Sequence, residues 1–133
     1  MFQITNLTTP GEPTEPLDPL QLEFGKMFTP NFFVSEYQNG AWRNPRIQKL
    51  EPFLLHPASL VFHYAQTVFE GLKAYRQVDG RVALFRPELN AKRFQQSAER
   101  LSIPKVEEAH FLDAVRAARR DSPYGIAGSP EQG

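Results

Sequence analysis

The apolar residues between Phe24 and Tyr37 are mostly aromatic and β-prone, which predicts strands. Residues 32–37 are rich in aromatic and β-branched side chains and predict the first strand. Asn39-Gly40 follows, a pair that tolerates the positive φ angles of a type I′ turn, so we expect a hairpin that returns through Trp42. Residues 47–55 predict a further strand, separated from the hairpin by Pro45.

After residue 60 the spacing predicts a short helix, a hairpin and a second helix. Apolar side chains recur at intervals of three and four residues at Val61, Ala65, Val68 and Leu72. Gly71 is expected to weaken or end this helix. Residues 73–78 and 81–85 bracket Asp79-Gly80, which predicts the second hairpin.

Two longer helices are predicted in the rest of the chain. Pro87 suits the first turn of a helix, because an amide proton at that position would have no partner within the helix. The negative charge of Glu88 interacts favourably with the helix dipole there. The apolar face of this helix is Phe94, Ala98 and Leu101, and its polar face is Asn90, Arg93, Ser97 and Arg100. Pro104 is expected to stop this helix.

The last helix is predicted to open at Glu107 and Glu108. Its inward positions are Phe111, Leu112, Val115 and Ala118, and its last turn carries Arg116, Arg119 and Arg120. A nucleic-acid-binding patch is one role for these arginines. Lys plus Arg and Asp plus Glu number 15 each, so the formal charge is zero, which favours a solvated helix end instead.

The two ends of the chain do not follow these patterns. Residues 1–20 carry four prolines and predict an extended arm without regular structure, rather than a Pro-rich ligand motif, which would need a basic anchor. Residues 122–133 predict a disordered tail. We therefore expect one folded domain over residues 21–121.

Composition excludes several classes of function. Zero formal charge argues against broad binding to nucleic acids or anionic membranes. The absence of cysteine excludes disulfides, thiol nucleophiles and thiolate metal sites, and it favours an intracellular, cytoplasmic location. No signal peptide and no membrane-spanning stretch are evident. The three histidines share no metal-binding spacing.

A few residues are candidates for chemistry. Arg93 is the best candidate for anion binding because a guanidinium is a fixed fork of donors; the alternative is a surface arginine or one paired with Glu88 or Glu99. Glu70 is a general base by type, without a second carboxylate to support that role. Of the five lysines, Lys73 is the candidate for a reactive amine.

Three aromatic residues are candidates for a pocket. Tyr64 has apolar neighbours and a phenol that needs a partner, which favours a core tyrosine. Phe24 and Phe69 either wall an apolar pocket or belong to the core of a chain with 11 phenylalanines.

Several segments stand in a specific order along the chain: Phe24–Thr29, Leu55–Ser59, His63–Tyr64, Phe69–Arg76 and Leu84–Pro87, then Asn90 and Arg93. From about residue 24 to about residue 119 they resemble the N-terminal domain of branched-chain amino acid aminotransferases, which are pyridoxal 5′-phosphate (PLP) enzymes of fold type IV. The resemblance implies an α+β fold, with an antiparallel sheet covered by two or three helices. It also implies a homodimer that acts on an amino acid and a 2-oxo acid; partners that are nucleic acids or membranes are disfavoured by the zero formal charge given above.

The resemblance implies roles for single residues. Arg93 matches the arginine that binds the cofactor phosphate, and Tyr64 matches a tyrosine of the active-site pocket. Phe24 and Phe69 match aromatics that line the pocket for the branched side chain. In this family the Schiff-base lysine and the glutamate at the pyridine nitrogen come from a second domain. None of the five lysines here matches that position, so we assign no catalytic residue and no metal ligand.

Three functions follow as hypotheses. The first is a truncated branched-chain aminotransferase, inactive alone, whose family transfers an amino group between leucine, isoleucine or valine and 2-oxoglutarate. The second is a non-catalytic interaction module that pairs with itself or with a full-length subunit. The third is a fragment of another fold-type-IV enzyme, a D-amino acid aminotransferase or an aminodeoxychorismate lyase.

Overall fold

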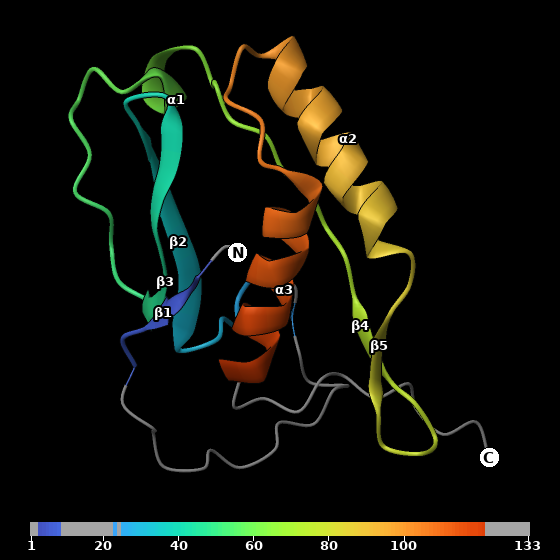
Figure 1. Ribbon diagram of the computed structural model, residues 1–133. Coiled ribbons are helices and arrows are strands. Elements are labelled where there is room, and N and C mark those ends of the chain that lie inside the picture. The colour runs from blue at the N-terminus through green and yellow to red at the C-terminus, as the bar shows by residue number, and fades with distance from the viewer. Residues whose placement is uncertain (1–2, 9–22, 24, 122–133) are drawn as a thin grey trace.

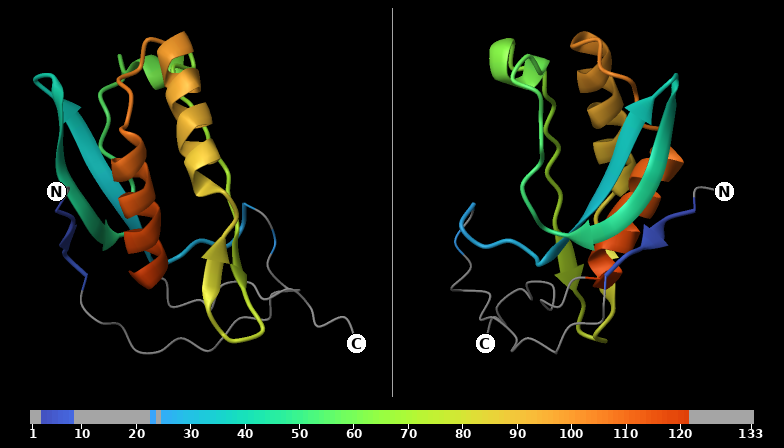
Figure 2. Two further views of the ribbon diagram at one scale, coloured as in Figure 1. Left: turned by 45° about the vertical axis from the view of Figure 1, so that its right-hand side comes forward. Right: turned by 90° about the vertical axis from the view of Figure 1, so that its left-hand side faces the viewer.

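The computed structural model describes residues 3–8, 23 and 25–121. The elements are β1 (Thr5–Asn6), β2 (Asn31–Gln38), β3 (Ala41–Lys49), α1 (Leu60–His63), β4 (Ala74–Arg76), β5 (Val82–Leu84), α2 (Pro87–Arg100) and α3 (Glu108–Asp121). Figures 1 and 2 show α3 against one face of the β2–β3 ribbon, with α2 beside α3 on its other side. The fold class is α+β, as predicted.

The strands form two sheets in place of one antiparallel sheet. The first has the order β1-β3-β2, with β1 parallel to β3 and β2 antiparallel to it, and the second is the antiparallel pair β4-β5. Thr5–Asn6 pair with Arg46 and Ile47, so the expectation that residues 1–20 hold no regular element is wrong at this point. The prolines begin only at Pro10, and the arm after residue 8 and the tail over 122–133 lie outside the described residues.

The first predicted hairpin is confirmed. Gln38 pairs with Ala41, so the loop between β2 and β3 is Asn39-Gly40. Asn39 has φ 51° and Gly40 has φ 78°, and a type I′ turn requires a positive φ at both positions. The type I′ turn matches the twist of the two strands, and the turn residues therefore set the register of the longest ribbon in the protein.

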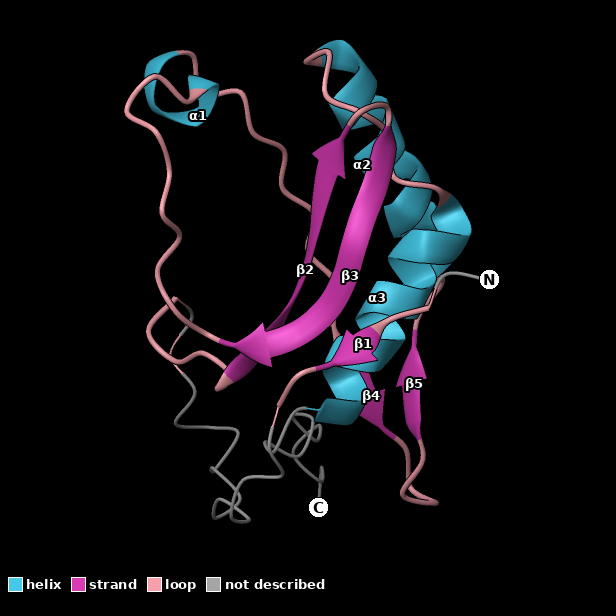
Figure 3. Ribbon diagram, turned by 60° about the vertical axis from the view of Figure 1, so that its left-hand side comes forward, coloured by secondary structure: helices cyan, strands magenta, loops and turns pink. Residues whose placement is uncertain are grey.

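Pro45 does not separate two strands as predicted, because β3 passes through it. The register moves from Val34 opposite Arg46 to Glu36 opposite Arg43, so β3 has one extra residue between these pairs. Such a bulge leaves one residue out of the ladder, where a missing amide proton is tolerated, and it bends the strand, as Figure 3 shows. The strand then ends at Lys49, and residues 50–59 contain no helix or strand.

The predicted helix over residues 61–72 is also wrong in its length. Only Leu60–His63 are helical, and residues 64–73 form no regular element. Ala65 has φ 48°, which no right-handed helix accommodates, and the Gln66 side chain donates to the Leu101 carbonyl over 2.8 Å. Val61, the first apolar position of the pattern, is 42% exposed, so it adds little of the packing that stabilises a helix in a protein.

The second hairpin and the two long helices are confirmed. Gly80 has φ 80° and donates its amide to the Gln77 carbonyl at the β4–β5 turn. Pro87 occupies the first turn of α2, as expected. α2 ends before Pro104, because Ser102 takes φ 55° and the Ile103 amide returns to the Ala98 carbonyl over 2.9 Å.

The helices are joined to the sheets by a small number of specific contacts. The Trp42 indole on β3 donates to the Lys105 carbonyl over 2.9 Å, and the rings of Phe94 and Phe111 lie 5.5 Å apart between α2 and α3. Arg119 at the end of α3 donates to the Val82 carbonyl of β5 over 3.1 Å, so it ties the hairpin to the helix and is not a solvated end. Among the described residues, the core positions are Ile47, Ala91 and Ala98, each at most 2% exposed.

Candidate functional site

A group of hydrogen-bonded polar side chains joins α2 to the loop that precedes β4. Arg93 donates through Nε to Glu70 Oε2 over 2.8 Å and through Nη2 to Glu70 Oε1 over 2.5 Å. Asn90, three residues before Arg93 on α2, donates through Nδ2 to the same Oε1 over 2.8 Å and to the Gly71 carbonyl over 3.1 Å. One turn of helix therefore holds the loop through its acidic side chain and its backbone.

The two partners of this ion pair differ sharply in exposure. The Glu70 side chain is 4% exposed, whereas the Arg93 side chain is 66% exposed. Hydrogen bonds from Arg93 lower the pKa of Glu70 to about 2; burial acts in the opposite direction, and Asn90 adds to the lowering. Glu70 in turn raises the pKa of Arg93. At neutral pH Glu70 is thus a bound carboxylate, a poor acceptor of a substrate proton.

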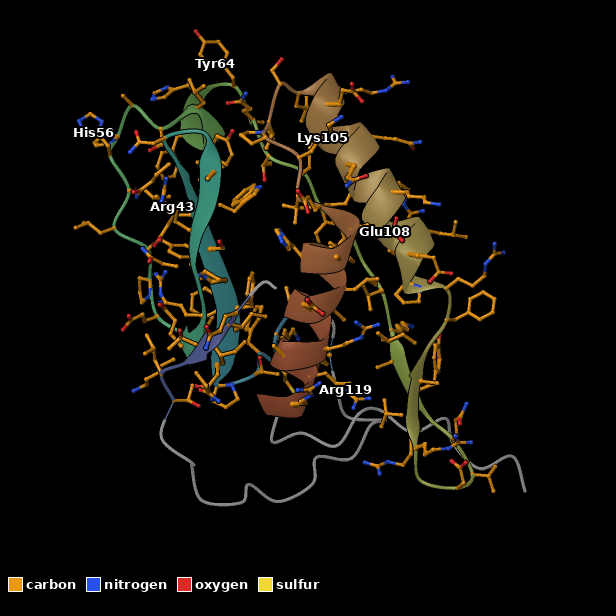
Figure 4. All side chains as sticks on the ribbon, in the orientation of Figure 1. Arg43, His56, Tyr64, Lys105, Glu108 and Arg119 are labelled. Atoms are coloured by element: carbon orange, nitrogen blue, oxygen red, sulfur yellow. The ribbon has the colours of Figure 1, made fainter. Side chains whose placement is uncertain are left out.

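Each of the sequence-based candidates can now be placed, except Phe24, which lies outside the described residues. Arg93 is paired, but with Glu70 and not with Glu88 or Glu99. Tyr64 follows α1 and is 80% exposed, so the core position is wrong; Figure 4 shows it at the edge of the molecule. Phe69 is 81% exposed, so it is not a core residue either.

A second feature is an apolar cavity of about 520 Å³ between the β2–β3 ribbon and the two long helices. Its walls include Phe32 and Trp42 from the ribbon, Phe94 from α2 and Phe111 from α3. Neither Tyr64 nor Phe69 lines it. The apolar helix positions could have indicated this cavity, but only the packing places α3 across the ribbon.

Other kinds of site find no support in the part of the chain that the structure describes. There, no three His, Cys, Asp or Glu side chains lie together in a way that could hold a metal ion. Within the same residues, no helix combines the length and the apolar character needed to cross a membrane. Each of the five lysines is exposed, and two of them face glutamates, Lys26 near Glu23 and Lys105 near Glu99.

The sequence was compared with known proteins. No family model matches the chain. It is 52% identical over 99 residues to branched-chain-amino-acid transaminase 1 of Bacillus subtilis (strain 168), a match that covers 74% of this chain and 28% of that protein. It is 42% identical over 117 residues to the cytosolic branched-chain-amino-acid aminotransferase of Rattus norvegicus, covering 84% of this chain and 28% of that protein. Over the matched residues, this chain is homologous to branched-chain aminotransferases.

The match confirms the resemblance that the motifs suggested. The chain spans 28% of the length of both of these branched-chain aminotransferases. The matched part, 74% of this chain in one case and 84% in the other, is consistent with the N-terminal domain predicted from residues 24–119.

The resemblance described above implies PLP as the cofactor. The phosphate and the aldehyde of PLP each require a particular kind of side chain. A phosphate accepts hydrogen bonds from a guanidinium fork, and two-thirds of the Arg93 side chain is open to solvent. That end of the cofactor fits. The aldehyde end requires an amine in a desolvated or cationic setting, and the lysines of this chain are all exposed. Arg93 thus has the donor chemistry that a phosphate needs, whereas the exposed lysines do not have the setting that the aldehyde end needs.

Proposed function

We propose that this chain forms the phosphate-binding part of a branched-chain aminotransferase site, with Arg93 as the donor to the cofactor phosphate. The observation that carries this proposal is the fixed position of an exposed guanidinium. Glu70 binds Arg93 and is itself held by Asn90, while 66% of the Arg93 side chain stays accessible to a ligand. The homology to branched-chain aminotransferases supports a phosphate-bearing cofactor.

In the whole enzyme, the proposed reaction is transfer of an amino group between leucine, isoleucine or valine and 2-oxoglutarate. When bound, PLP would act as the electron sink for this reaction. Tyr64 and Phe69 would contribute to the substrate pocket, because both are exposed apolar surfaces and a branched side chain needs apolar walls. The proposal includes a cytoplasmic location and a homodimer.

The proposal also states that the 133-residue chain does not turn over amino acids by itself. Proton transfer at the substrate Cα needs a base within hydrogen-bond reach. Glu70 is bound to Arg93 and Asn90, and the five lysines are exposed, two of them near glutamates. Glu70, the carboxylate that contacts Arg93, is therefore a poor base for that step.

The experiment uses the purified chain with PLP, followed by borohydride reduction, intact mass and a peptide map. We expect no single lysine to be labelled stoichiometrically and no turnover of leucine. Stoichiometric labelling of one lysine, such as Lys73, would show that one domain has built a complete site.

Phosphate binding is tested separately, by calorimetric titration with pyridoxine 5′-phosphate, which has no aldehyde and does not react with lysines. Arg93→Ala should weaken binding by about tenfold or more, because it removes a charge-assisted fork. Arg100→Ala removes an equal charge from an exposed position of the same helix and should leave the affinity within about twofold. Equal effects of the two substitutions would overturn the role of Arg93.

A second candidate function is supported by exposed apolar side chains. Leu54 is 102% exposed, Phe69 81% and Phe85 78%. Such side chains favour contact with another protein surface, so a non-catalytic interaction module is the alternative proposal. No observation in the structure favours the third hypothesis, a D-amino acid aminotransferase or an aminodeoxychorismate lyase.

A further inference from the structure

Arg93 uses one edge of its guanidinium on Glu70 and leaves another edge outward. The pair is formed side-on, by Nε and Nη2. A guanidinium has five N–H donors in a rigid plane, so this pair occupies two of them. No described residue accepts a hydrogen bond from Nη1. The outer edge, made of Nη1 and the second Nη2 proton, is the edge that a second oxyanion can meet with two parallel hydrogen bonds.

The position of Glu70 is itself fixed. Its side chain is 4% exposed, and Asn90 bonds both its Oε1 and the carbonyl of Gly71, the next residue. Asn90 and Arg93 belong to the same turn of α2, so the loop is held at two points by one rigid element. Rotation of the Arg93 side chain would break bonds to a carboxylate that has little access to water.

We infer that Glu70 is a positioning residue, which turns the outer edge of Arg93 toward a phosphate monoester. This inference rests on the proposed function, because it assumes that Arg93 binds phosphate. It goes beyond that function by assigning a role to a residue that carries the same sign of charge as the ligand.

Two physical effects of Glu70 oppose each other, and this makes the inference testable. Its negative charge weakens the attraction of Arg93 for an anion. Its hydrogen bonds order the long arginine side chain before the ligand arrives, which lowers the entropy cost of binding. If charge dominates, neutralising Glu70 tightens phosphate binding. If orientation dominates, as we infer, neutralising Glu70 weakens it.

The test titrates the full chain with pyridoxine 5′-phosphate, pyridoxine and inorganic phosphate by calorimetry. Glu70→Gln removes the charge and keeps the length, whereas Glu70→Asp keeps the charge and shortens the reach. Glu99→Gln is the control for removal of a negative charge. Glu99 lies on α2, the helix that carries Arg93, but it is 69% exposed and contacts Lys105 rather than Arg93. The Arg93 Nε–H resonance in NMR spectra reports whether the guanidinium is held. Circular dichroism verifies the fold of each variant.

The expected result is that both Glu70 variants bind pyridoxine 5′-phosphate about three- to tenfold more weakly, the cost of ordering one long side chain. Their Arg93 Nε–H signal should broaden, while Glu99→Gln changes neither. A cofactor phosphate is indicated if inorganic phosphate and pyridoxine both bind much more weakly, and free phosphate is indicated if the two phosphates bind alike. Either source supports the inference.

Two results would overturn the inference, and only one of them also rejects the proposed function. Unchanged or tighter binding by both Glu70 variants, with Arg93→Ala still impaired, rejects the positioning role and leaves the proposed function intact. Absence of saturable phosphate binding by the wild-type chain, with its Arg93 Nε–H signal sharp, rejects both. If Glu70→Gln does not fold, the Glu70→Asp arm decides alone, since that variant retains the charge.

Discussion

Glu70 carries a negative charge at a place that is nearly closed to water, and two side chains of α2 make that possible. Arg93 and Asn90 both bond its Oε1. A buried carboxylate without such partners would favour its protonated form. Sequence alone could not pair Glu70 with Arg93, because 23 residues separate them and the β4–β5 hairpin lies between the loop and α2.

The Glu70 carboxyl should make the stability of the fold depend on pH in a predictable direction. Its folded pKa of about 2 lies below the ordinary value of 4.5. Its contribution is therefore complete above pH 4.5 and is lost as the pH falls toward 2. Urea unfolding of wild type and Glu70→Gln should differ most above pH 4.5, and the gap should close at lower pH. A gap that is constant down to pH 2.5 would contradict the assigned cause; Glu99→Gln is the control.

At the scale of elements, local backbone chemistry explains where strands and helices begin and end. Asn39-Gly40, Gly80 and Pro87 were each interpreted correctly from sequence because their roles depend on their own φ angles. The end of α2 was not, because Ser102 adopts a left-handed conformation that glycine usually provides. The stretch after Val61 shows the opposite case: its spacing is helical, but Ala65 takes φ 48° and Val61 is 42% exposed.

Ser102 gives a prediction at this scale. Ser102→Gly should stabilise the protein by about 0.5–1 kcal/mol, because glycine has no Cβ to strain a positive φ. Ser97→Gly, in the interior of α2, should destabilise the protein by about 0.5 kcal/mol. Chemical denaturation of both variants measures the two values. A loss of stability in Ser102→Gly would show that the Ser102 side chain stabilises the turn by more than the strain of its positive φ costs.

At the scale of the whole molecule, the helices and sheets enclose little fully buried surface. The core positions among the described residues include two alanines, Ala91 and Ala98, on α2. Large apolar side chains such as Leu54 and Phe85 are exposed. Large exposed apolar side chains favour association with another protein surface.

We therefore expect the isolated chain to self-associate. Sedimentation velocity over a hundredfold range of concentration should show a rising sedimentation coefficient. Leu54→Glu and Phe85→Glu should reduce the association, because a charge opposes burial at an interface. Lys92→Glu, a charge change at an exposed position of α2, is the control. A strict monomer at the highest concentration would count against the interaction-module hypothesis.

The sequence by itself determined the local features: the two hairpin turns, the starts of α2 and α3 along the chain, and the family motifs. These depend on residues close together in the chain, whose φ preferences and spacing are readable directly. Only the tertiary structure decided that β3 passes through Pro45, that Arg119 ties the β4–β5 hairpin to α3, and that Glu70 binds Arg93. Each of these depends on partners that are distant in sequence, and local propensity contains no information about which distant groups meet.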